Sequence, residues 1–381
     1  MRSIYFDYNA TTPLDPEVKE AMLPFLGENF GNPSSIHHLG RRARAALDDA
    51  RDRVATIFRC KPSEVVFTSG GTESNNLAIF GTVRHCRAKG RHIITSRIEH
   101  HAVLHAIEYL EKHEGCEVTY LPPDRAGRVS PEDLKAALRP DTVLVSIMAA
   151  NNETGTLQPI QEIGRMCRDA RVRFHTDAVQ WFGKMPFDCV EQFNADLVSI
   201  CAHKFHGPKG AGALYIRSPL LPEPILFGGG HENERRAGTE NVPAIIGLAE
   251  AVERFVRSPV FPQGELETLT NRLTAGVESI EGVTQRGSKT NRLSNTLAFT
   301  VAGCDSLSLL AGLDMEGICA SSGSACSAGS LEPSHVLKAM AVPAELAQSF
   351  VRFSLGREST ADEVERTLSV LPEVIQRIRR G

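Results

Sequence analysis

Short apolar runs alternate with amphipathic segments along residues 65 to 216, and this alternation constrains the fold more than any other feature. Runs such as Val65–Thr68 and Leu197–Ile200 have the length and β-branched composition of buried strands. The stretches between them have the apolar spacing of helices. Strands that are joined through helices run parallel, and a parallel sheet needs helices on both faces. The chain is therefore predicted to be an α/β protein with a mostly parallel sheet.

A cluster of proline and glycine at residues 258–264, SPVFPQG, interrupts a helical pattern that begins near Val242. Such clusters end helices and mark connections between domains. With 381 residues the chain is long enough for two domains. We expect a large domain over residues 15–257 and a smaller C-terminal α/β domain over 258–381, joined by the N-terminal segment 1–14.

Charge and cysteine content exclude several classes of protein. The 42 basic and 46 acidic residues give no basic patch that would favour nucleic acid as a partner. No apolar run reaches the length of a membrane span, and no signal-peptide pattern precedes the first strand, so we expect a cytoplasmic protein without membrane contact. The nine cysteines show no zinc-ligand spacing, and the histidine pairs at 37–38 and 100–101 point apart. No metal is expected.

Lys204 lies in the stretch CAHKFHGPKG, residues 201–210, between an apolar run and a Gly-Pro-Lys-Gly turn. Burial at a strand end favours the neutral amine, which is the form that attacks a carbonyl to make a Schiff base. A single lysine at such a place is more often an ordinary solvated side chain. Its interpretation as a reactive amine depends on the residues around it.

Three other stretches carry polar residues directly after predicted strands. TSGGTESNN, residues 68–76, opens a helix, and its glycines and free N–H groups suit a phosphate, although a simple helix cap is an equal alternative. Asp177 and Gln180 follow a second strand and Asn152 a third, where each could also cap a turn. Ligands of open α/β sheets bind at the carboxyl ends of strands. With Lys204, these residues are the parts needed to hold pyridoxal 5'-phosphate.

Ten motifs spread over nearly the whole chain show that it resembles the cysteine desulfurases of the NifS/IscS-like group, within the class-V aminotransferases. They are YFDYNATTP (5–13), FGNPSS (30–35), FTSGGTESNN (67–76), EHHAVL (99–104), NNETGT (151–156), HTDAVQ (175–180), HKFHGPKG (203–210), RRAGTEN (235–241), SSGSACSAGSLEPSHVL (321–337) and RFSLGR (352–357). The resemblance implies the fold-type-I architecture of pyridoxal-phosphate enzymes, with a mostly parallel seven-stranded sheet in the large domain.

The resemblance also implies a role for each site residue. Lys204 would form the Schiff base with the cofactor, Asp177 would pair with the pyridinium nitrogen, and His100 would stack on the ring and move protons. Asn152 and Gln180 would contact the phenolic oxygen of the cofactor. The phosphate would be held by Gly71, Thr72, His203 and the second subunit's Thr239. Arg352, with Asn32, would bind the substrate carboxylate. Cys201 replaces a serine that commonly touches the phosphate, and a thiol is a weaker hydrogen-bonding group.

Cys326 lies in a long stretch rich in Ser, Gly and Ala, residues 317–333, which we expect to be an irregular functional loop. Small neighbours leave a thiol accessible, whereas an apolar site such as that of Cys319 leaves it inert. By the resemblance, L-cysteine is converted to L-alanine, and the Cys326 thiolate takes the sulfur as a persulfide. The sulfur then passes to an acceptor protein such as an iron–sulfur scaffold. Thr239 implies a homodimer with composite sites.

Three alternatives stay open at this point. A selenocysteine lyase or an aminotransferase would share the fold, although an aminotransferase has no use for Cys326. A sulfur-relay protein without catalysis would need none of Lys204, Asp177, His100 and Arg352. The chain ends soon after a predicted helix at 361–379, so the scaffold docking of longer relatives is not implied.

Overall fold

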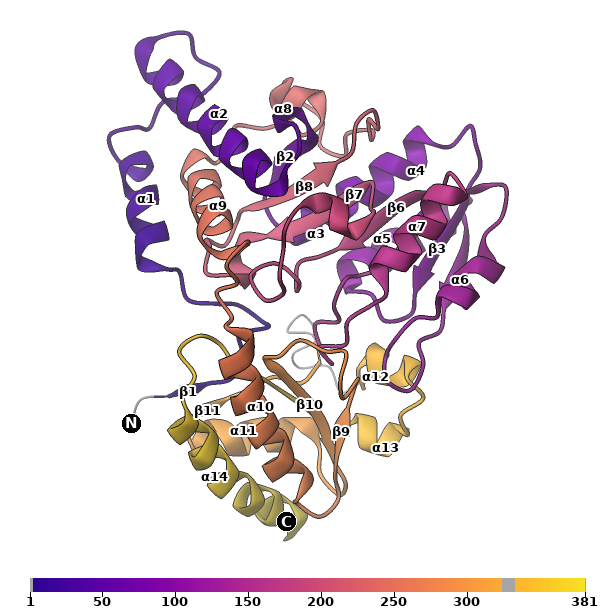
Figure 1. Ribbon diagram of the computed structural model, residues 1–381, viewed down its shortest axis with the longest axis vertical. Coiled ribbons are helices and arrows are strands. Elements are labelled where there is room, and N and C mark those ends of the chain that lie inside the picture. Colours follow the sequence, from indigo (N-terminus) through magenta and orange to yellow (C-terminus); the bar gives the residue numbers. More distant parts are fainter. Residues whose placement is uncertain (1–2, 324–332, 381) are drawn as a thin grey trace.

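The computed structural model describes residues 3–323 and 333–380. A seven-stranded sheet with the order β2-β8-β7-β6-β5-β3-β4 forms the centre of its upper part (Figure 1). β8 is antiparallel to β2 and β7, and the other neighbouring pairs are parallel, so the predicted mostly parallel sheet is confirmed. The strands are β2 (Val65–Thr68), β3 (His92–Ser96), β4 (Glu117–Leu121), β5 (Thr142–Ser146), β6 (Arg173–Asp177), β7 (Leu197–Cys201) and β8 (Gly212–Ile216).

Both faces of this sheet are covered, and in β2 and β8 alternate residues enter different hydrophobic clusters. Val65 and Phe67 of β2 pack with apolar residues of α2 and α9, whereas Val66 between them packs with Leu77 and Ala78. The helices are α1 (Pro16–Leu26), α2 (His38–Phe58), α3 (Gly71–Asn76), α4 (Thr82–His85), α5 (His101–His113), α6 (Pro131–Ala137), α7 (Ile160–Asp169), α8 (His231–Glu234) and α9 (Val242–Phe255). Short turns are η1 (Pro62–Glu64), η2 (Leu77–Gly81), η3 (Val190–Phe193) and η4 (Ala202–Lys204).

Local capping explains where the first helix begins. The Asp15 carboxylate accepts hydrogen bonds from the backbone N–H groups of Glu17 and Val18, and Pro16 occupies the first turn, as predicted. The helix that begins in the TSGGTESNN motif (residues 68–76) is continuous from Gly71 through α3, η2 and α4, with a π-helical turn in the middle. Turns of this kind are frequent near functional sites.

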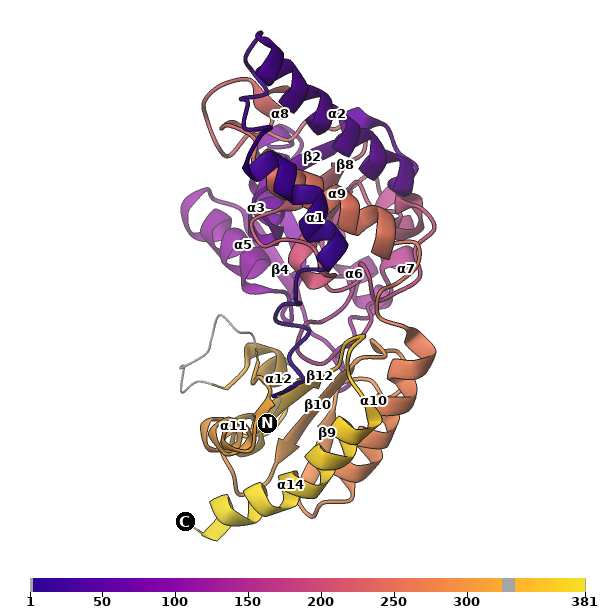
Figure 2. The same cartoon turned by 90° about the vertical axis from the view of Figure 1, so that its left-hand side faces the viewer.

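The C-terminal part is built on a separate three-stranded antiparallel sheet with the order β12-β10-β9 (Figures 1 and 2). Its elements are α10 (Gln263–Glu278), β9 (Val283–Arg286), β10 (Thr296–Val301), α11 (Ser306–Met315), α12 (His335–Ala339), α13 (Ala344–Ala347), β12 (Phe350–Ser354) and α14 (Ala361–Arg380). We propose that this part is the smaller domain over residues 258–381. The separate sheet supports this division, as does the break between α9 and α10.

The N-terminal segment belongs to this lower part before it crosses to α1. β1 (Ile4–Tyr5) pairs in parallel with β11 (Ile318–Cys319), and Asp7 forms a bridge to Ser354, the last residue of β12. The expectation that residues 317–333 are irregular throughout is therefore wrong for β11. Ile318 and Cys319 form a strand because they pair with β1, which is more than 300 residues away in the sequence. No local sequence pattern predicts that pairing.

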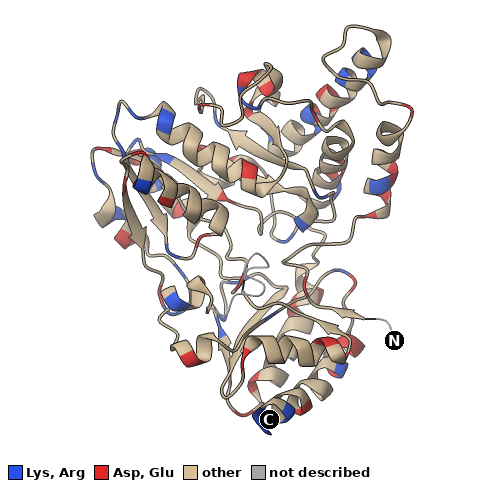
Figure 3. Ribbon diagram, turned by 180° about the vertical axis from the view of Figure 1, so that it is seen from behind, with Lys and Arg blue, Asp and Glu red and all other residues tan. Residues whose placement is uncertain are grey.

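Charged residues of both signs are interspersed along the ribbon (Figure 3). No helix within residues 3–323 and 333–380 is long and apolar enough to cross a membrane. In the same ranges no group of three or more His, Cys, Asp or Glu side chains is arranged to hold a metal ion.

Candidate active site

Five strands of the large sheet end at one edge, and residues after each of them surround a single cavity. β2, β3, β5, β6 and β7 all run in the same direction, so their carboxyl ends lie together, where ligands of such sheets bind. The cavity has a volume of about 230 Å³. It is lined by Asn9, Ala10, Gly71, Thr72, Asn75, His100, Met148, Ala150, Asn152, Asp177, Val179, Gln180, Cys201, His203, Lys204 and Arg352.

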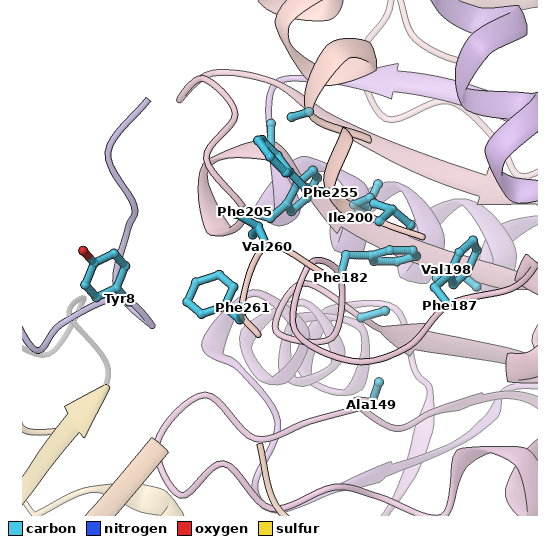
Figure 4. Close-up of a cluster of buried hydrophobic side chains, with 14 of the residues drawn as sticks. Tyr8, Ala149, Phe182, Phe187, Val198, Ile200, Phe205, Phe255, Val260 and Phe261 are labelled. Atoms are coloured by element: carbon cyan, nitrogen blue, oxygen red, sulfur yellow. The ribbon is translucent and has the colours of Figure 1, made fainter. Parts of the chain in front are cut away.

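Lys204 ends the turn η4 that follows β7, and its amine lies at this cavity. Nζ donates to the backbone carbonyls of Asn9 at 2.7 Å and Ala10 at 2.8 Å. Burial, with the charge of Arg352 as the next cause, lowers the pKa of Lys204 to about 8. The next residue, Phe205, is fully buried in the hydrophobic cluster of Figure 4 and anchors the turn. The amine is therefore held in place and is partly neutral near pH 7.

Asp177 is the last residue of β6, and both of its carboxylate oxygens are oriented by neighbours. Oδ2 accepts from Asn75 Nδ2 at 2.7 Å, and Oδ1 accepts from the Val179 backbone N–H at 3.0 Å. The sequence interpretation missed Asn75. Asn75 could have been predicted, because in the TSGGTESNN motif it lies one helical turn after Gly71 and so faces the same side.

The end of β2 and the end of β7 form a small cradle around Gly71, Thr72, Cys201 and His203. A Cβ on Gly71 would lie 2.9 Å from Val179 Cγ2, so a larger residue there would displace either the cradle or the Val179 side chain. Burial lowers the pKa of His203 to about 4, and its Nδ1 lies 3.1 Å from Thr11 Oγ1, which leaves a neutral ring. Burial raises the pKa of the Cys201 thiol, so that sulfur adds no charge. Free N–H groups and a glycine at a helix start suit a phosphate.

His100 caps the N-terminus of α5, with Nδ1 accepting from the Ala102 backbone N–H at 3.1 Å. In the neutral ring the proton therefore resides on Nε2. Burial lowers the pKa of His100, which favours this neutral form. The preceding residue, Glu99, is fully buried and accepts from Met148 N and Ser96 Oγ. Burial raises the pKa of Glu99 to about 8.

Arg352, in β12 of the C-terminal part, lines the cavity. Its Nη2 lies 2.7 Å from Asp7 Oδ1, and Nη1 donates to the Asn152 carbonyl at 2.8 Å. Its Nε is buried without a hydrogen-bond partner in the described part of the chain. Buried guanidinium donors are normally paired, so an acceptor such as a ligand carboxylate is expected at this position.

Asn9 connects the two parts at the base of the cavity and was not among the predicted site residues. Its carbonyl accepts from both Lys204 Nζ and Gln180 Nε2, and its side chain contacts Lys184 and Thr296. The motif YFDYNATTP, one of those that carry the family resemblance, contains Asn9, although no role was predicted for Asn9 itself. Only the structure brings it beside residues nearly 200 positions away.

Ten predicted site residues meet at the cavity, and their individual roles remain predictions. Asn32 and Thr239 are exposed and do not line it. Cys326 lies outside the described residues. The ten are Gly71, Thr72, His100, Asn152, Asp177, Gln180, Cys201, His203, Lys204 and Arg352.

These residues fit pyridoxal phosphate. The cavity offers an amine with a pKa of about 8, an oriented strand-end carboxylate and a glycine cradle for a phosphate. Arg352 Nε, which has no hydrogen-bond partner within residues 3–323 and 333–380, is a donor that a ligand carboxylate would satisfy. Each group that the cofactor and an amino acid would need is therefore present at one cavity.

Comparison with known proteins agrees with this geometry. The sequence profile of the Aminotransferase class-V family matches residues 4–367. Cysteine desulfurase IscS of Dictyoglomus turgidum is 50% identical over 99% of this chain and 96% of its own length, and that of Methanosarcina thermophila is 50% identical over 99% and 93%.

Solved structures give the same result. A NifS-like protein superimposes with a TM-score of 0.91 at 38% identity, covering 98% of this chain and 99% of its own. SspA in complex with cysteine superimposes with a TM-score of 0.82 at 38% identity, covering 94% of this chain and all of its own. The chain therefore belongs to the class-V aminotransferase family, within its pyridoxal-phosphate-dependent cysteine desulfurases.

Proposed function

We propose that the chain converts L-cysteine to L-alanine and transfers the sulfur to its own Cys326 as a persulfide. The observation that carries this proposal is the meeting of Lys204 and Arg352 at one cavity. Lys204 supplies an amine that is partly neutral near pH 7, and Arg352 supplies a buried donor for an amino-acid carboxylate. The amine and the carboxylate site define an α-amino acid as the substrate class.

Each residue has a defined task in this scheme. Pyridoxal phosphate, when bound, supplies an aldehyde that condenses with amines and a ring that accepts the electron pair of the α-carbon. Arg352 orients the substrate through its carboxylate. Lys204 removes the α-proton and returns a proton later, since a pKa near 8 makes both of its forms accessible. His100 holds a proton on Nε2 at the same cavity.

The sulfur step is a displacement at sulfur. The Cys326 thiolate forms a new S–S bond while the C–S bond of the substrate breaks, and the electron pair of that bond stays on carbon. That carbon takes a proton, so L-cysteine and the Cys326 thiol become L-alanine and a Cys326 persulfide. The persulfide then passes sulfur to an acceptor thiol, for which we propose an iron–sulfur scaffold protein in the cytoplasm.

A homodimer is part of the proposal because Thr239 lies outside the cavity of its own chain. Ser34 Oγ and His231 Nε2 lie 3.3 Å apart, so the loop after α1 adjoins the loop that leads to Thr239. Large apolar side chains on these two loops are exposed: Phe30 at 72%, Ile36 at 90% and Phe227 at 84%. Exposed apolar residues gathered in this way are typical of subunit contacts. A second copy would cover them and bring its Thr239 to the phosphate.

Sedimentation tests the dimer. The native protein should sediment as a dimer at micromolar concentration, and Phe227→Asp should sediment as a monomer that loses its cofactor. A native monomer that retains the cofactor would contradict the composite site.

Product release from L-cysteine tests the function. With a reductant present, the native protein should release alanine and sulfide in equal amounts, and Cys326→Ala should lose both while its visible cofactor absorbance is unchanged. Cys304→Ala is the matched control and should keep full activity. Full activity of Cys326→Ala would exclude the persulfide, and release of alanine from selenocysteine alone would favour a selenocysteine lyase.

A further inference from the structure

Lys184 is a buried lysine beside the cavity that the proposed reaction does not use. It is 2% exposed, and the described residues include no ion-pair partner for it. Its Nζ donates to Asn9 Oδ1 at 2.8 Å and to Gln180 Oε1, and it lies 5.3 Å from the centre of the Phe261 ring. Burying an amine is unfavourable, and a methionine would fill the same space. An amine at this place therefore calls for an explanation beyond packing.

The turn after β6 places Lys184 and Gln180 on the same side. Backbone N–H groups of Phe182 and Lys184 bond back to Ala178 and Trp181, so the segment coils like a helix. Residues four apart then face the same way. Phe182 points to the other side, where it stacks with Phe58 and contacts Phe187 (Figure 4). The aromatic contacts of Phe182 hold the turn in place. On the opposite side of the turn, Gln180 and Lys184 contact Asn9.

The amine fixes the orientation of the Gln180 amide. Two N–H donors of Lys184 satisfy Asn9 Oδ1 and Gln180 Oε1 in either protonation state. Burial, followed by the charges of Lys204 and Arg352, lowers the pKa of Lys184 well below its ordinary value. Its hydrogen-bond donation to these two oxygens does not depend on whether the amine is charged. With Oε1 committed to Lys184, the Nε2 donor points to the Asn9 carbonyl at 2.9 Å, the same oxygen that Lys204 contacts.

We propose that Lys184 is a positioning residue, which holds the Gln180 amide so that the second N–H of Nε2, and not the amide oxygen, faces the cofactor. This inference rests on the proposed function, in which Gln180 contacts the phenolic oxygen. A donor stabilises the negative charge on that oxygen, whereas a rotated amide would present its own oxygen and repel it.

A double-mutant cycle on the holoenzyme tests the inference. The measured quantity is the pH midpoint of the visible absorbance change of the bound cofactor. Lys184→Met removes the donor at similar volume and should raise the midpoint by about one pH unit, as Gln180→Leu should. In the Lys184→Met/Gln180→Leu double variant the midpoint should rise no further, because Lys184 acts only through Gln180. Lys289→Met, an exposed matched control, should leave the midpoint unchanged.

Several outcomes would overturn the inference. They are an unchanged midpoint in folded Lys184→Met, or shifts that add in the double variant. If Lys184→Met does not fold, Lys184→Gln is measured instead, because it keeps an N–H donor at residue 184. Its midpoint should match that of the native protein, and a shift as large as that of Gln180→Leu would contradict donation by residue 184. A native protein without cofactor absorbance would instead contradict the proposed function itself.

Discussion

Asp7 and Arg352 form an ion pair of 2.7 Å that joins the N-terminal segment to β12 at the wall of the cavity. The guanidinium is 2% exposed and also donates to the carbonyl of Asn152. Two of its nitrogens are thus bonded to the protein, and Nε has no hydrogen-bond partner in the described part of the chain. The geometry depends on the fork of an arginine, since an ammonium has no comparable planar array of donors.

Arg352→Lys should therefore raise KM for L-cysteine at least tenfold with little change in the cofactor spectrum. A lysine at 352 cannot contact Asp7, Asn152 and a carboxylate together. Steady-state alanine formation measures the effect. Arg357→Lys is the matched control, because Arg357 pairs with Asp15 away from the cavity and should alter KM less than twofold. A native KM in Arg352→Lys would show that the carboxylate binds elsewhere.

The rate of cofactor capture by the apoprotein should follow the protonation of Lys204. Only the neutral amine attacks an aldehyde, and a pKa of about 8 makes about a tenth of it neutral at pH 7. The rate should rise about tenfold from pH 6 to pH 7 and level off above pH 9. Stopped-flow absorbance after mixing with pyridoxal phosphate measures it. A rate that keeps rising to pH 10.5 would indicate an unperturbed lysine.

Gly71→Ala should weaken cofactor binding at least tenfold. The new methyl group would meet Val179 Cγ2 at 2.9 Å, so the start of α3 or the Val179 side chain has to shift, and either shift changes the cradle. Equilibrium titration of the apoprotein gives the dissociation constant. Gly264→Ala in α10, where nothing lies within 4 Å of the added Cβ, should leave that constant unchanged. Equal affinities in both variants would place the phosphate away from Gly71.

Glu99→Gln should flatten the dependence of stability on pH. The folded-state pKa of Glu99 is about 8, above its ordinary value of 4.5, so folding takes up a proton between these pH values. The stabilisation is complete below pH 4.5 and is lost as pH rises towards 8, with a slope of about 1.4 kcal/mol per pH unit. Over that range it sums to about 5 kcal/mol at most.

Urea unfolding of the apoprotein between pH 5 and pH 8 measures this slope. Glu99→Gln removes the titrating group and should lower the slope by up to about 1.4 kcal/mol per pH unit. Glu345→Gln, at an exposed position, should leave the slope unchanged. An unchanged slope in Glu99→Gln would mean that Glu99 is ionised in the folded protein.

The fold and much of the site could be predicted because local patterns encode them. Apolar runs of strand length, and caps such as Asp15 before Pro16, depend only on neighbours in sequence. Residues that follow parallel strands necessarily gather at one edge of the sheet. Lys204, Asp177 and Gly71 could therefore be assigned to one site before any distance was known.

Tertiary structure alone decided which polar groups contact one another within that site. The contact between Asp7 and Arg352 spans 345 positions, and that between Lys184 and Asn9 spans 175. The pairing of β1 with β11 is equally remote in sequence. Periodicity and capping report interactions over a few residues, whereas these contacts depend on how two packed sheets meet. The sequence by itself determined the chemistry available at the sheet edge, and the packing of the C-terminal part against that edge determined which donors remain free for ligands.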